Sequence, residues 1–507
     1  MDARTADSER GSAQRVFDRL LHGGLIALLI ASTMNGLSLE WRVSGTEFTV
    51  RPDQVVLVLL VPLVFLAFVL GRFRFQWTLF DWVVLGFFGS NFAASILSGS
   101  SPTASIRGAV LLAAYGAMYF VVKQILTNRA EWLPAATTWT LGLGIAQAAY
   151  CLIALVLYAF GHGIGGLQIG HLRAGSVAIK GTFWEANLLG AYLALMAIFL
   201  IIRYAWRTET RAGARTLWGL LITTLALPLT VTRAAGVALA LGTVAIALVV
   251  WIFRREILEW RARAARIALT LCAVLLLTVT AMDDFVSGLS RYPNFLLERW
   301  IPISWSVPEG DAPEASAAGV EASADTPGPP VGDVTRASRS SVEGRVDAWA
   351  QALEGWRERP ILGHGTLAGA NLTKEGWWYS SLVQALFDTG LVGFVVLLWI
   401  YVGAVVLPVR SWLLTRQTSI SPNLLGYGAG NAVLAFSSQF SSFLFVGFPW
   451  VFLGLSMAAV HASRTRGSRA TAEAAHPTRP RPAVAELFKL GPSGADVRQT
   501  ARDGHTD

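Results

Sequence analysis

The sequence predicts an all-α, polytopic membrane protein of about twelve transmembrane helices, with a large extracytoplasmic loop that carries short amphipathic helices. Its 507 residues are 53% hydrophobic and only 15% charged, whereas a soluble domain carries about 25% charged residues. Apolar runs of about 20 residues recur along the chain, and each is long enough to cross a hydrocarbon layer of roughly 30 Å. Basic residues fall in every second connection between these runs. A chain of this kind uses lipid as its solvent.

The apolar runs predict the spans one by one. In order they are Leu20–Leu37, Val55–Leu70, Leu79–Leu97, Ile106–Val122, Trp132–Phe160, Ala186–Ile202, Thr216–Leu229, Gly236–Phe253, Ile267–Met282, Leu391–Val409, Leu424–Phe445 and Val451–Ala462. The first run is too long for the apolar region of a signal peptide, so we interpret it as a span. Whether the two runs around Pro228–Arg233 are separate helices or one broken helix stays open.

The connections orient these spans. Their basic clusters lie on the same side as both termini, and the positive-inside rule assigns that side to the cytoplasm. The clusters are Arg72/Arg74, Lys123/Arg129, Arg203/Arg207/Arg211/Arg215, Arg254/Arg255/Arg261/Arg263/Arg266 and Arg410/Arg416. We therefore expect a multi-pass protein of the inner (cytoplasmic) membrane, with both termini in the cytoplasm and the active site on the extracytoplasmic side.

This orientation divides the chain into five parts. They are a cytoplasmic N-terminal segment at 1–19, spans one to nine within 20–282, an extracytoplasmic loop at 283–378, spans ten to twelve within 379–463, and a disordered cytoplasmic tail at 464–507. Within the loop, residues at about 306–340 are rich in Ala, Pro, Gly and acidic side chains. Such a stretch buries too little apolar surface to order itself, so we expect a flexible insertion.

An amphipathic helix is predicted after that insertion. Val346, Trp349, Ala350, Leu353 and Trp356 recur at helical spacing and form one apolar stripe. A proline four residues beyond the stripe ends the helix. The helix is expected to lie on the outer membrane surface or to pack over the bundle, where it could also cover a membrane cavity.

Several function classes are excluded by missing motifs. The chain has no Walker loop, dinucleotide-binding glycine motif, zinc-protease motif or nucleophile elbow. No acidic cluster on the outer side is suited to a divalent metal, so neither a metal nor another cofactor is expected. The net charge of +8 mainly orients the spans, and nucleic acid is not an expected partner. Cys151 and Cys272 both lie inside apolar runs and indicate no disulfide framework.

The informative charges are the basic residues on the outer side, against the topology rule. They are Arg173, Lys180, Arg233, Arg291, Arg299, Arg336, Arg339 and Arg345. Arg233 follows the apolar run L-A-L-P-L-T-V-T and lies at or below the outer interface. It either extends to lipid headgroups or faces a cavity that binds an anion. Its planar fork of donors suits a phosphate.

Two further segments have both a structural and a functional interpretation. Arg345 lies in the first turn of the amphipathic helix, where a cation is either solvated or aimed at a ligand. The segment K-G-T-F-W-E-A-N-L-L-G, from Lys180 to Gly190, precedes a span. Structurally, Gly181 would make a turn and Asn187 would cap the helix.

Taken together, these segments resemble one family. In order they are K-G-T-F-W-E-A-N-L-L-G-A-Y, L-T-V-T-R-A-A-G, G-R-V-D-A-W-A-Q-A-L with P-I-L-G-H-G, and Y-S-S-L-V-Q-A-L-F-D-T-G-L-V-G. This series, with a long outer loop before the last spans, resembles the O-antigen ligase and O-antigen polymerase superfamily of GT-C-like membrane glycosyltransferases. The likeness covers roughly residues 180–393, apart from the insertion.

The resemblance implies an activity and a set of site residues. Members take a glycan from an undecaprenyl-diphosphate carrier on the outer face and transfer it to another carrier-linked glycan or to lipid A core, without nucleotide or metal. The family's arginines correspond to Arg233 and to Arg345, the latter with Trp349, and its loop corresponds to Gly181–Asn187. Lys180, Glu185, Arg173 and Arg291 are further substrate-binding candidates.

Two departures from the family pattern bear on the reaction. Ala186 replaces a proline, and Tyr379-Ser380 stands where ligases carry His-Asn, so the histidine that would activate the acceptor is missing. Tyr379 is a poor base, since its unperturbed pKa is about 10. The other candidates for a catalytic base are His162, His171, Glu185 and His364. This replacement favours a polymerase, or a divergent member with another acceptor, over a lipid A core ligase.

The alternative hypothesis is a transporter of a lipid-linked oligosaccharide or a small anion. About twelve spans and cavity-facing arginines would suit it equally well. Transporters often show internal two-fold repetition with matching broken helices. The sequence shows no such repeat, because the large loop falls only once, late in the chain.

Overall fold

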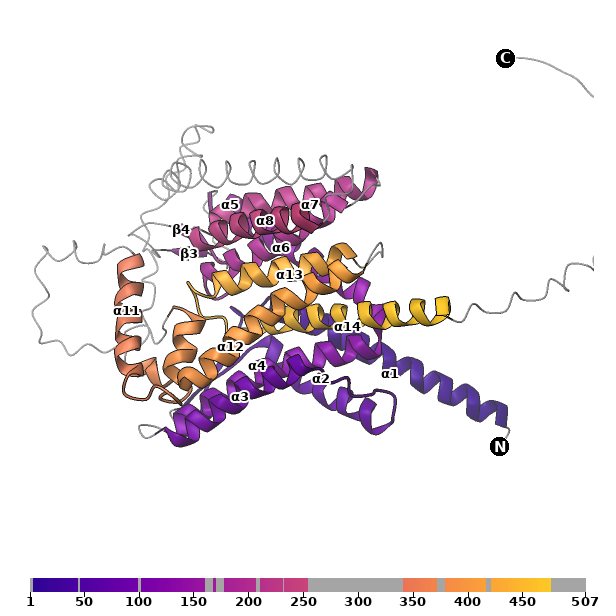
Figure 1. Ribbon diagram of the computed structural model, residues 1–507, viewed down its shortest axis with the longest axis horizontal. Coiled ribbons are helices and arrows are strands. Elements are labelled where there is room, and N and C mark those ends of the chain that lie inside the picture. The colour runs from indigo at the N-terminus through magenta and orange to yellow at the C-terminus, as the bar shows by residue number, and fades with distance from the viewer. Residues whose placement is uncertain are drawn as a thin grey trace, which may run out of the picture. The chain divides into compact units, whose positions relative to one another are not determined.

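The computed structural model describes residues 3–43, 46–98, 102–159, 167–169, 177–206, 210–230, 232–253, 341–371, 379–415 and 421–475. It is mostly helical in these ranges, with twelve α-helices and two short β-hairpins (Figure 1). The chain divides into two compact units at 463/464, and the site described below lies in the first. The predicted ninth span, Ile267–Met282, and the predicted insertion lie outside the described residues.

Six helices in the described ranges are long and apolar enough to cross a membrane. They are α2 (Pro52–Val69), α3 (Leu79–Leu97), α4 (Pro102–Asn128), α5 (Leu133–Ala159) with the 3-10 turn before it, α6 (Ala186–Trp206) and α12 (Ser381–Leu414). Helices α7 (Thr210–Leu229) and α8 (Arg233–Phe253) contain shorter apolar stretches. The prediction of a helical membrane protein is thus confirmed, while the count of twelve spans stays a prediction.

The remaining helices are α1 (Ala3–Ser32), α11 (Ser341–Trp356), α13 (Ser421–Ser437) and α14 (Gly447–Ala475). Helices α7 and α8 are separate, because α7 ends at Leu229 and α8 begins at Arg233. The two apolar runs around Pro228–Arg233 are therefore separate helices and not one broken helix. In Figure 1, α11 runs across the direction of the other helices, and it packs against α12.

The strictly α-helical prediction misses the two antiparallel hairpins. Strand β1 (Leu39–Val43) pairs with β2 (Thr46–Val50), and β3 (Leu167–Ile169) pairs with β4 (Val177–Ile179). The strands of the first hairpin read L-E-W-R-V and T-E-F-T-V, which alternate polar residues with the aromatic and β-branched types that favour strands. Each hairpin lies in a connection between helices, so the helical bundle itself is unaffected.

Two predicted helix boundaries near the site are wrong. Helix α12 begins at Ser381, ten residues before the predicted span, and continues across a kink at Gly390, whose φ is +63°. Helix α13 ends at Ser437, whereas the apolar run predicted helix as far as Phe445. The residues that follow are S-Q-F-S-S-F-L-F, and serine side chains compete for backbone hydrogen bonds and so favour turns.

Helix α6 forms the centre of the bundle. It is buried on all sides from Leu188 to Ile202 and contacts α5, α7, α8 and α13. A helix that is apolar all round is expected in such a position. Helix α12 packs on α13 and on α3. The N-terminal end of α6 therefore brings the segment that precedes it, residues 180–185, to the middle of one end of the bundle.

Candidate active site

The connection between α13 and α14, residues 438–446, is fastened to the first turn of α12. The backbone N–H of Ser381 donates to the Ser438 carbonyl at 2.8 Å. In return, the backbone N–H of Phe443 donates to Ser381 Oγ at 3.1 Å. We call residues 438–446 the connecting segment. These bonds place it beside the residues that replace the family's His-Asn pair.

The connecting segment also reaches the residues that precede α6. Ser441 Oγ donates to Glu185 Oε2 at 3.4 Å, across 256 positions of sequence. Asn187 Nδ2 donates to Glu185 Oε1 at 2.7 Å. Thr232, immediately before α8, donates from Oγ1 to Asn187 Oδ1 at 3.4 Å. Two of the predicted motifs and the connecting segment are thus linked through Glu185 and Asn187.

The segment 180–185 is held by the connection that follows α1. Gly181 adopts φ +60°, a conformation that glycine takes without strain. Thr182 Oγ1 donates to the Thr33 carbonyl at 2.6 Å, and the backbone N–H of Trp184 donates to Asn35 Oδ1 at 3.2 Å. The expected turn is therefore present, and it is fixed by tertiary bonds as well as by its own glycine.

Asn187 is not the N-cap that its structural interpretation suggests. Helix α6 begins at Ala186, so Asn187 lies in the first turn, and its amide bridges Glu185 and Thr232. A glycine in the next turn permits this approach: a Cβ at Gly190 would lie 2.8 Å from Thr232 Oγ1. Asn187 therefore links the start of α6 to the start of α8.

Arg233 is the first residue of α8, and its side chain is exposed. Within the described ranges its guanidinium forms no hydrogen bond or ion pair. Lys180 is half-buried and is likewise without such a partner in this part of the chain. Both cations therefore keep their donors available to a ligand or to solvent, close to the bonds that link Asn187 and Thr232.

Arg345 and Tyr379 lie together on the other side of the connecting segment. Arg345 is half-buried in α11, and its Cζ atom is 5.8 Å from the centroid of the Tyr379 ring, a cation–π distance. Tyr379 has φ +54°, which is uncommon for a residue with a side chain and is often found where function requires it. Trp349, one turn after Arg345, is half-buried.

Helix α11 packs through a different face from the predicted stripe. Ala348 and Ala352 are buried against Phe387 of α12. Val346 and Leu353, which belong to the stripe, are 52% and 42% exposed. The small alanines allow the close approach to α12, while the larger apolar side chains point away. The helix thus packs on α12, in agreement with one of its two predicted locations, and it does so through small residues beside the predicted stripe.

His364 connects the end of α11 to α12. Its Nε2 atom lies 2.8 Å from the Gly355 carbonyl, and its ring stacks on Phe387 with a centroid distance of 4.6 Å. A carbonyl can only accept, so Nε2 carries the proton. Gly363, with φ +67°, packs so closely that a Cβ would lie 2.5 Å from the Asp388 carbonyl carbon. Here the glycine serves packing against α12, not approach to a ligand.

Asp388, in the D-T-G sequence of α12, holds the loop after α11 and the connecting segment in place. It is buried, and its Oδ2 atom accepts from the Leu367 N–H at 3.1 Å and from Gln384 Nε2 at 3.4 Å. Gln384 Oε1 in turn accepts a short hydrogen bond from Ser442 Oγ in the connecting segment. Asp388 thus anchors both the loop after α11 and, through Gln384, the connecting segment.

Arg51, at the start of α2, is a residue of this cluster that the sequence interpretation missed. Its Nη1 atom donates to Tyr115 Oη at 2.9 Å and to the Phe445 carbonyl at 3.2 Å. Its Cζ atom lies 5.2 Å from the centroid of the Trp184 ring. The available signal was an arginine in the predicted outer connection between the first two spans, which the interpretation of outer basic residues left out.

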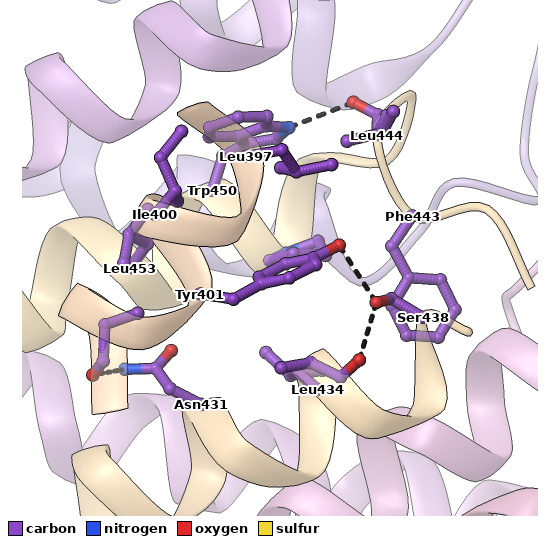
Figure 2. Close-up of a pocket in the computed structure, with 13 residues that line it drawn as sticks. Leu397, Ile400, Tyr401, Asn431, Leu434, Ser438, Phe443, Leu444, Trp450 and Leu453 are labelled. Carbon is purple, nitrogen blue, oxygen red and sulfur yellow. Dashed lines mark hydrogen bonds between the residues drawn. The ribbon is translucent and has the colours of Figure 1, made fainter. Parts of the chain in front are cut away.

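An apolar cavity of about 60 Å³ lies between α12, α13 and α14, next to the connecting segment (Figure 2). Its polar edge is Ser438 Oγ, which donates to Tyr401 Oη at 2.9 Å, and Asn431 Nδ2, which donates to the Ala404 carbonyl at 2.9 Å. The cavity is too small and too apolar to hold a glycan or a diphosphate.

Several predicted residues lie outside the described ranges. They are Arg173, Arg291, Arg299, Arg336, Arg339, His162 and His171. Among the residues that the structure does describe, no group of three His, Cys, Asp or Glu side chains could hold a metal ion.

Part of the chain, including several residues of this site, matches a known protein family. Residues 218–398 match the family model described as O-antigen ligase, and no curated protein matches the chain. The matched region contains Arg233, Arg345, His364 and Tyr379, and it ends just beyond the kink of α12. Segment 180–190 lies outside it and joins the same site through the bonds of Glu185 and Asn187. The protein is therefore an integral membrane protein whose residues 218–398 match the O-antigen ligase family model, and this match supports its place in the O-antigen ligase and polymerase superfamily.

Proposed function

We propose that this protein transfers or polymerises glycan from an undecaprenyl-diphosphate-linked donor on the outer face of the cytoplasmic membrane. The acceptor is a second glycan or a lipid-linked glycan, and we favour surface-polysaccharide polymerisation over ligation to lipid A core. One observation carries the proposal. The connecting segment bonds to Glu185, just before α6, and to Ser381 of α12. Glu185 is linked through Asn187 to Thr232, which directly precedes Arg233, a residue whose guanidinium has no partner in the described ranges. Arg345 of α11 lies over the ring of Tyr379, just before α12.

The chemistry needs groups of this kind. A glycosyl diphosphate already contains a good leaving group, and the charge that develops when its C1–O bond breaks resides on the diphosphate. Guanidinium groups fixed in a water-poor site stabilise that charge without reorganising. In this proposal Arg233 and Arg345 bind the diphosphate, and no metal is required. Lys180 adds a third positive charge at the start of the Gly181–Asn187 loop.

The held conformation of the loop supports this assignment. Hydrogen bonds from Gly36 and to Thr33 fix Thr182 on both its backbone and its side chain. The bond from Thr232 to Asn187 fixes the loop relative to the first turn of α8. Substrate groups bound between these elements would be oriented by rigid helix ends, and orientation of reactants contributes substantially to rate.

A transfer assay tests the proposal. The full chain, purified in detergent, is incubated with carrier-linked glycan, and the products are analysed for new glycosidic bonds. Wild-type protein should form them, and Arg233→Ala and Arg345→Ala should form almost none. The matched control is Arg357→Ala, which removes an exposed arginine one residue beyond α11. Movement of intact carrier-linked glycan across a membrane with no new bond would instead indicate a transporter.

Cells separate the two transferase activities. Deletion that shortens surface polysaccharide chains indicates a polymerase, whereas full-length chains that are not attached indicate a ligase. Unchanged chain length and unchanged attachment would contradict both.

A further inference from the structure

Among the site residues that the structure describes, four groups could accept a proton from an acceptor hydroxyl: Tyr379, His364, Asp388 and Glu185. Asp388 is buried, and its Oδ2 atom holds the Leu367 N–H and the Gln384 amide, so it serves to anchor the loop after α11. The Tyr379 ring faces the Arg345 guanidinium, and a phenol is a weak base at neutral pH. His364 uses Nε2 to donate to the Gly355 carbonyl and stacks on Phe387, so it serves to join α11 to α12. The remaining candidate is Glu185.

The Glu185 carboxylate has the geometry of an oriented base. Oε1 accepts from Asn187 and Oε2 accepts from Ser441, one bond to each oxygen. A carboxylate offers about four lone-pair sites, so each oxygen keeps one available. Its side chain is half-buried, and it forms no ion pair within the described ranges. Both donors are neutral groups. Within the described ranges, therefore, no cation is bound to the Glu185 carboxylate and neutralises its charge.

The position of Glu185 relative to Arg233 also fits a displacement reaction. Asn187 bonds to Glu185 on one side and to Thr232 on the other, and Thr232 directly precedes Arg233. A short chain of hydrogen bonds thus joins the base to Thr232, the residue next to Arg233 in sequence. Such an arrangement can act on a nucleophile and a leaving group of the same sugar carbon.

We propose that Glu185 is the base that removes the proton from the acceptor hydroxyl, an inference that rests on the proposed function. The acceptor oxygen bonds to C1 of the donor sugar while the bond between C1 and the diphosphate oxygen breaks. The electron pair of the broken bond leaves on the diphosphate, next to the arginines. The hydroxyl proton passes to the Glu185 carboxylate. Ser441 is a positioning residue, since it acts on the reaction only through Glu185.

A purely structural role for Glu185 makes different predictions. The residue directly precedes α6, and a carboxylate near a helix N-terminus stabilises the helix. In that role its loss would lower thermal stability, and added small carboxylates would have no effect on activity. If Glu185 is the base, its loss should lower activity with little change in thermal stability, and added small carboxylates should restore activity.

The experiment compares Glu185→Gln, Glu185→Ala and Glu185→Asp in the full chain, with carrier-linked glycan as donor. We expect Glu185→Gln to lower kcat by about 10²–10⁴-fold, the usual contribution of a general base. The KM for the donor and the melting temperature should change little. Formate should restore activity at least about tenfold in Glu185→Ala, because it can take the place of the missing carboxylate. Ser441→Ala should reduce kcat less than any Glu185 variant.

Retention of near wild-type kcat by Glu185→Gln would overturn the inference, and so would loss of activity that formate does not relieve and that follows a lower melting temperature. The proposed function is tested separately by the wild-type protein. If wild type forms no glycosidic product, the proposed function fails. If wild type is active and Arg233→Ala is not, while Glu185→Gln is fully active, only the assignment of the base fails.

Discussion

Two charged clusters in this helical bundle differ in how completely their charges are paired. In the first, Asp81 at the start of α3 and Lys123 of α4 form a salt bridge in which both side chains are fully buried. Asp81 also accepts from the Thr78 N–H at 2.6 Å and from Tyr119 Oη at 2.5 Å, and Lys123 donates to the Gln76 carbonyl at 2.8 Å. Every charged group of this cluster has several internal partners.

The second cluster is the candidate active site, and it is incomplete. Arg233 and Lys180 have no internal partner in the described ranges, and Glu185 is held only by neutral donors. Unpaired charge next to an apolar bundle is costly unless a ligand or water completes it. The comparison suggests a general distinction: charges that hold a fold together are paired within the chain, and charges that serve a substrate are left available.

The largest expected effect is on stability in the first cluster. Lys123→Ala leaves Asp81 buried without its cation, and breaking one side of a buried pair typically costs 3–5 kcal/mol. We expect a large fall in the melting temperature of the detergent-purified protein. Asp81→Asn combined with Lys123→Met removes both charges and should recover part of that loss. An unchanged melting temperature for Lys123→Ala would contradict the comparison.

The next effect is on catalysis in the second cluster. Arg233→Ala removes a guanidinium that has no structural partner, so the melting temperature should stay within about 1–2 °C of wild type. Loss of one preorganised contact to the developing charge should raise the barrier by about 3 kcal/mol, or more than 100-fold in kcat. The initial rate of glycan transfer measures it. A fall in stability without a specific loss of rate would assign Arg233 to the fold.

Arg51 is intermediate between the two clusters, because only part of its guanidinium is paired within the chain. Nη1 is bonded to Tyr115 and Phe445, while Nη2 and Nε form no hydrogen bond in the part of the chain described here. Tyr115→Phe removes the acceptor of two internal bonds, from Arg51 Nη1 at 2.9 Å and from Gln54 Nε2 at 3.3 Å. At about 0.5–1.5 kcal/mol for a typical bond, stability should fall by roughly 1–3 kcal/mol, with transfer nearly unchanged. Arg51→Ala should show a comparable loss of stability and, in addition, about a tenfold lower transfer rate, equivalent to one bond to a charged group.

For Arg51, thermal unfolding and initial rates measured on the same preparations separate the two contributions. Equal losses of rate in Tyr115→Phe and Arg51→Ala would show that Arg51 acts only through the fold.

The smallest effect concerns Tyr379. Tyr379→Phe keeps the ring beneath Arg345, so we expect transfer within about twofold of wild type. Tyr379→Leu removes the cation–π contact, which is worth about 0.5–1 kcal/mol at a partly exposed site, and should slow transfer about two- to fivefold. Initial rates of glycan transfer by the two variants distinguish a role of the ring from a role of the hydroxyl. Loss of activity in Tyr379→Phe would show that the hydroxyl is essential and would assign the base to Tyr379 instead of Glu185.

Sequence reasoning predicted what hydropathy and short motifs encode. The apolar runs predicted the spanning helices, and the break before Arg233 and the helix around Arg345 followed from local patterns. The connecting segment was missed, because its Phe and Leu residues continue the apolar run of α13 and conceal the serines that end the helix.

Contacts between distant residues could not be predicted in this way. The bond from Ser441 to Glu185 joins residues 256 positions apart, and Arg51 reaches Phe445 across 394 positions. Periodicity carries no information about which helix ends meet. For the same reason the apolar stripe did not reveal that α11 packs on α12 through Ala348 and Ala352, which are small enough for close approach.

The most direct test of the central claim is the initial rate of glycosidic bond formation by the purified protein with a polyprenyl-diphosphate-linked glycan. The account predicts product from wild type and from Arg357→Ala, and a rate more than 100-fold lower from Arg233→Ala at an unchanged melting temperature. Equal rates for Arg233→Ala and Arg357→Ala would contradict it, because the unpaired guanidinium would then have no part in the reaction.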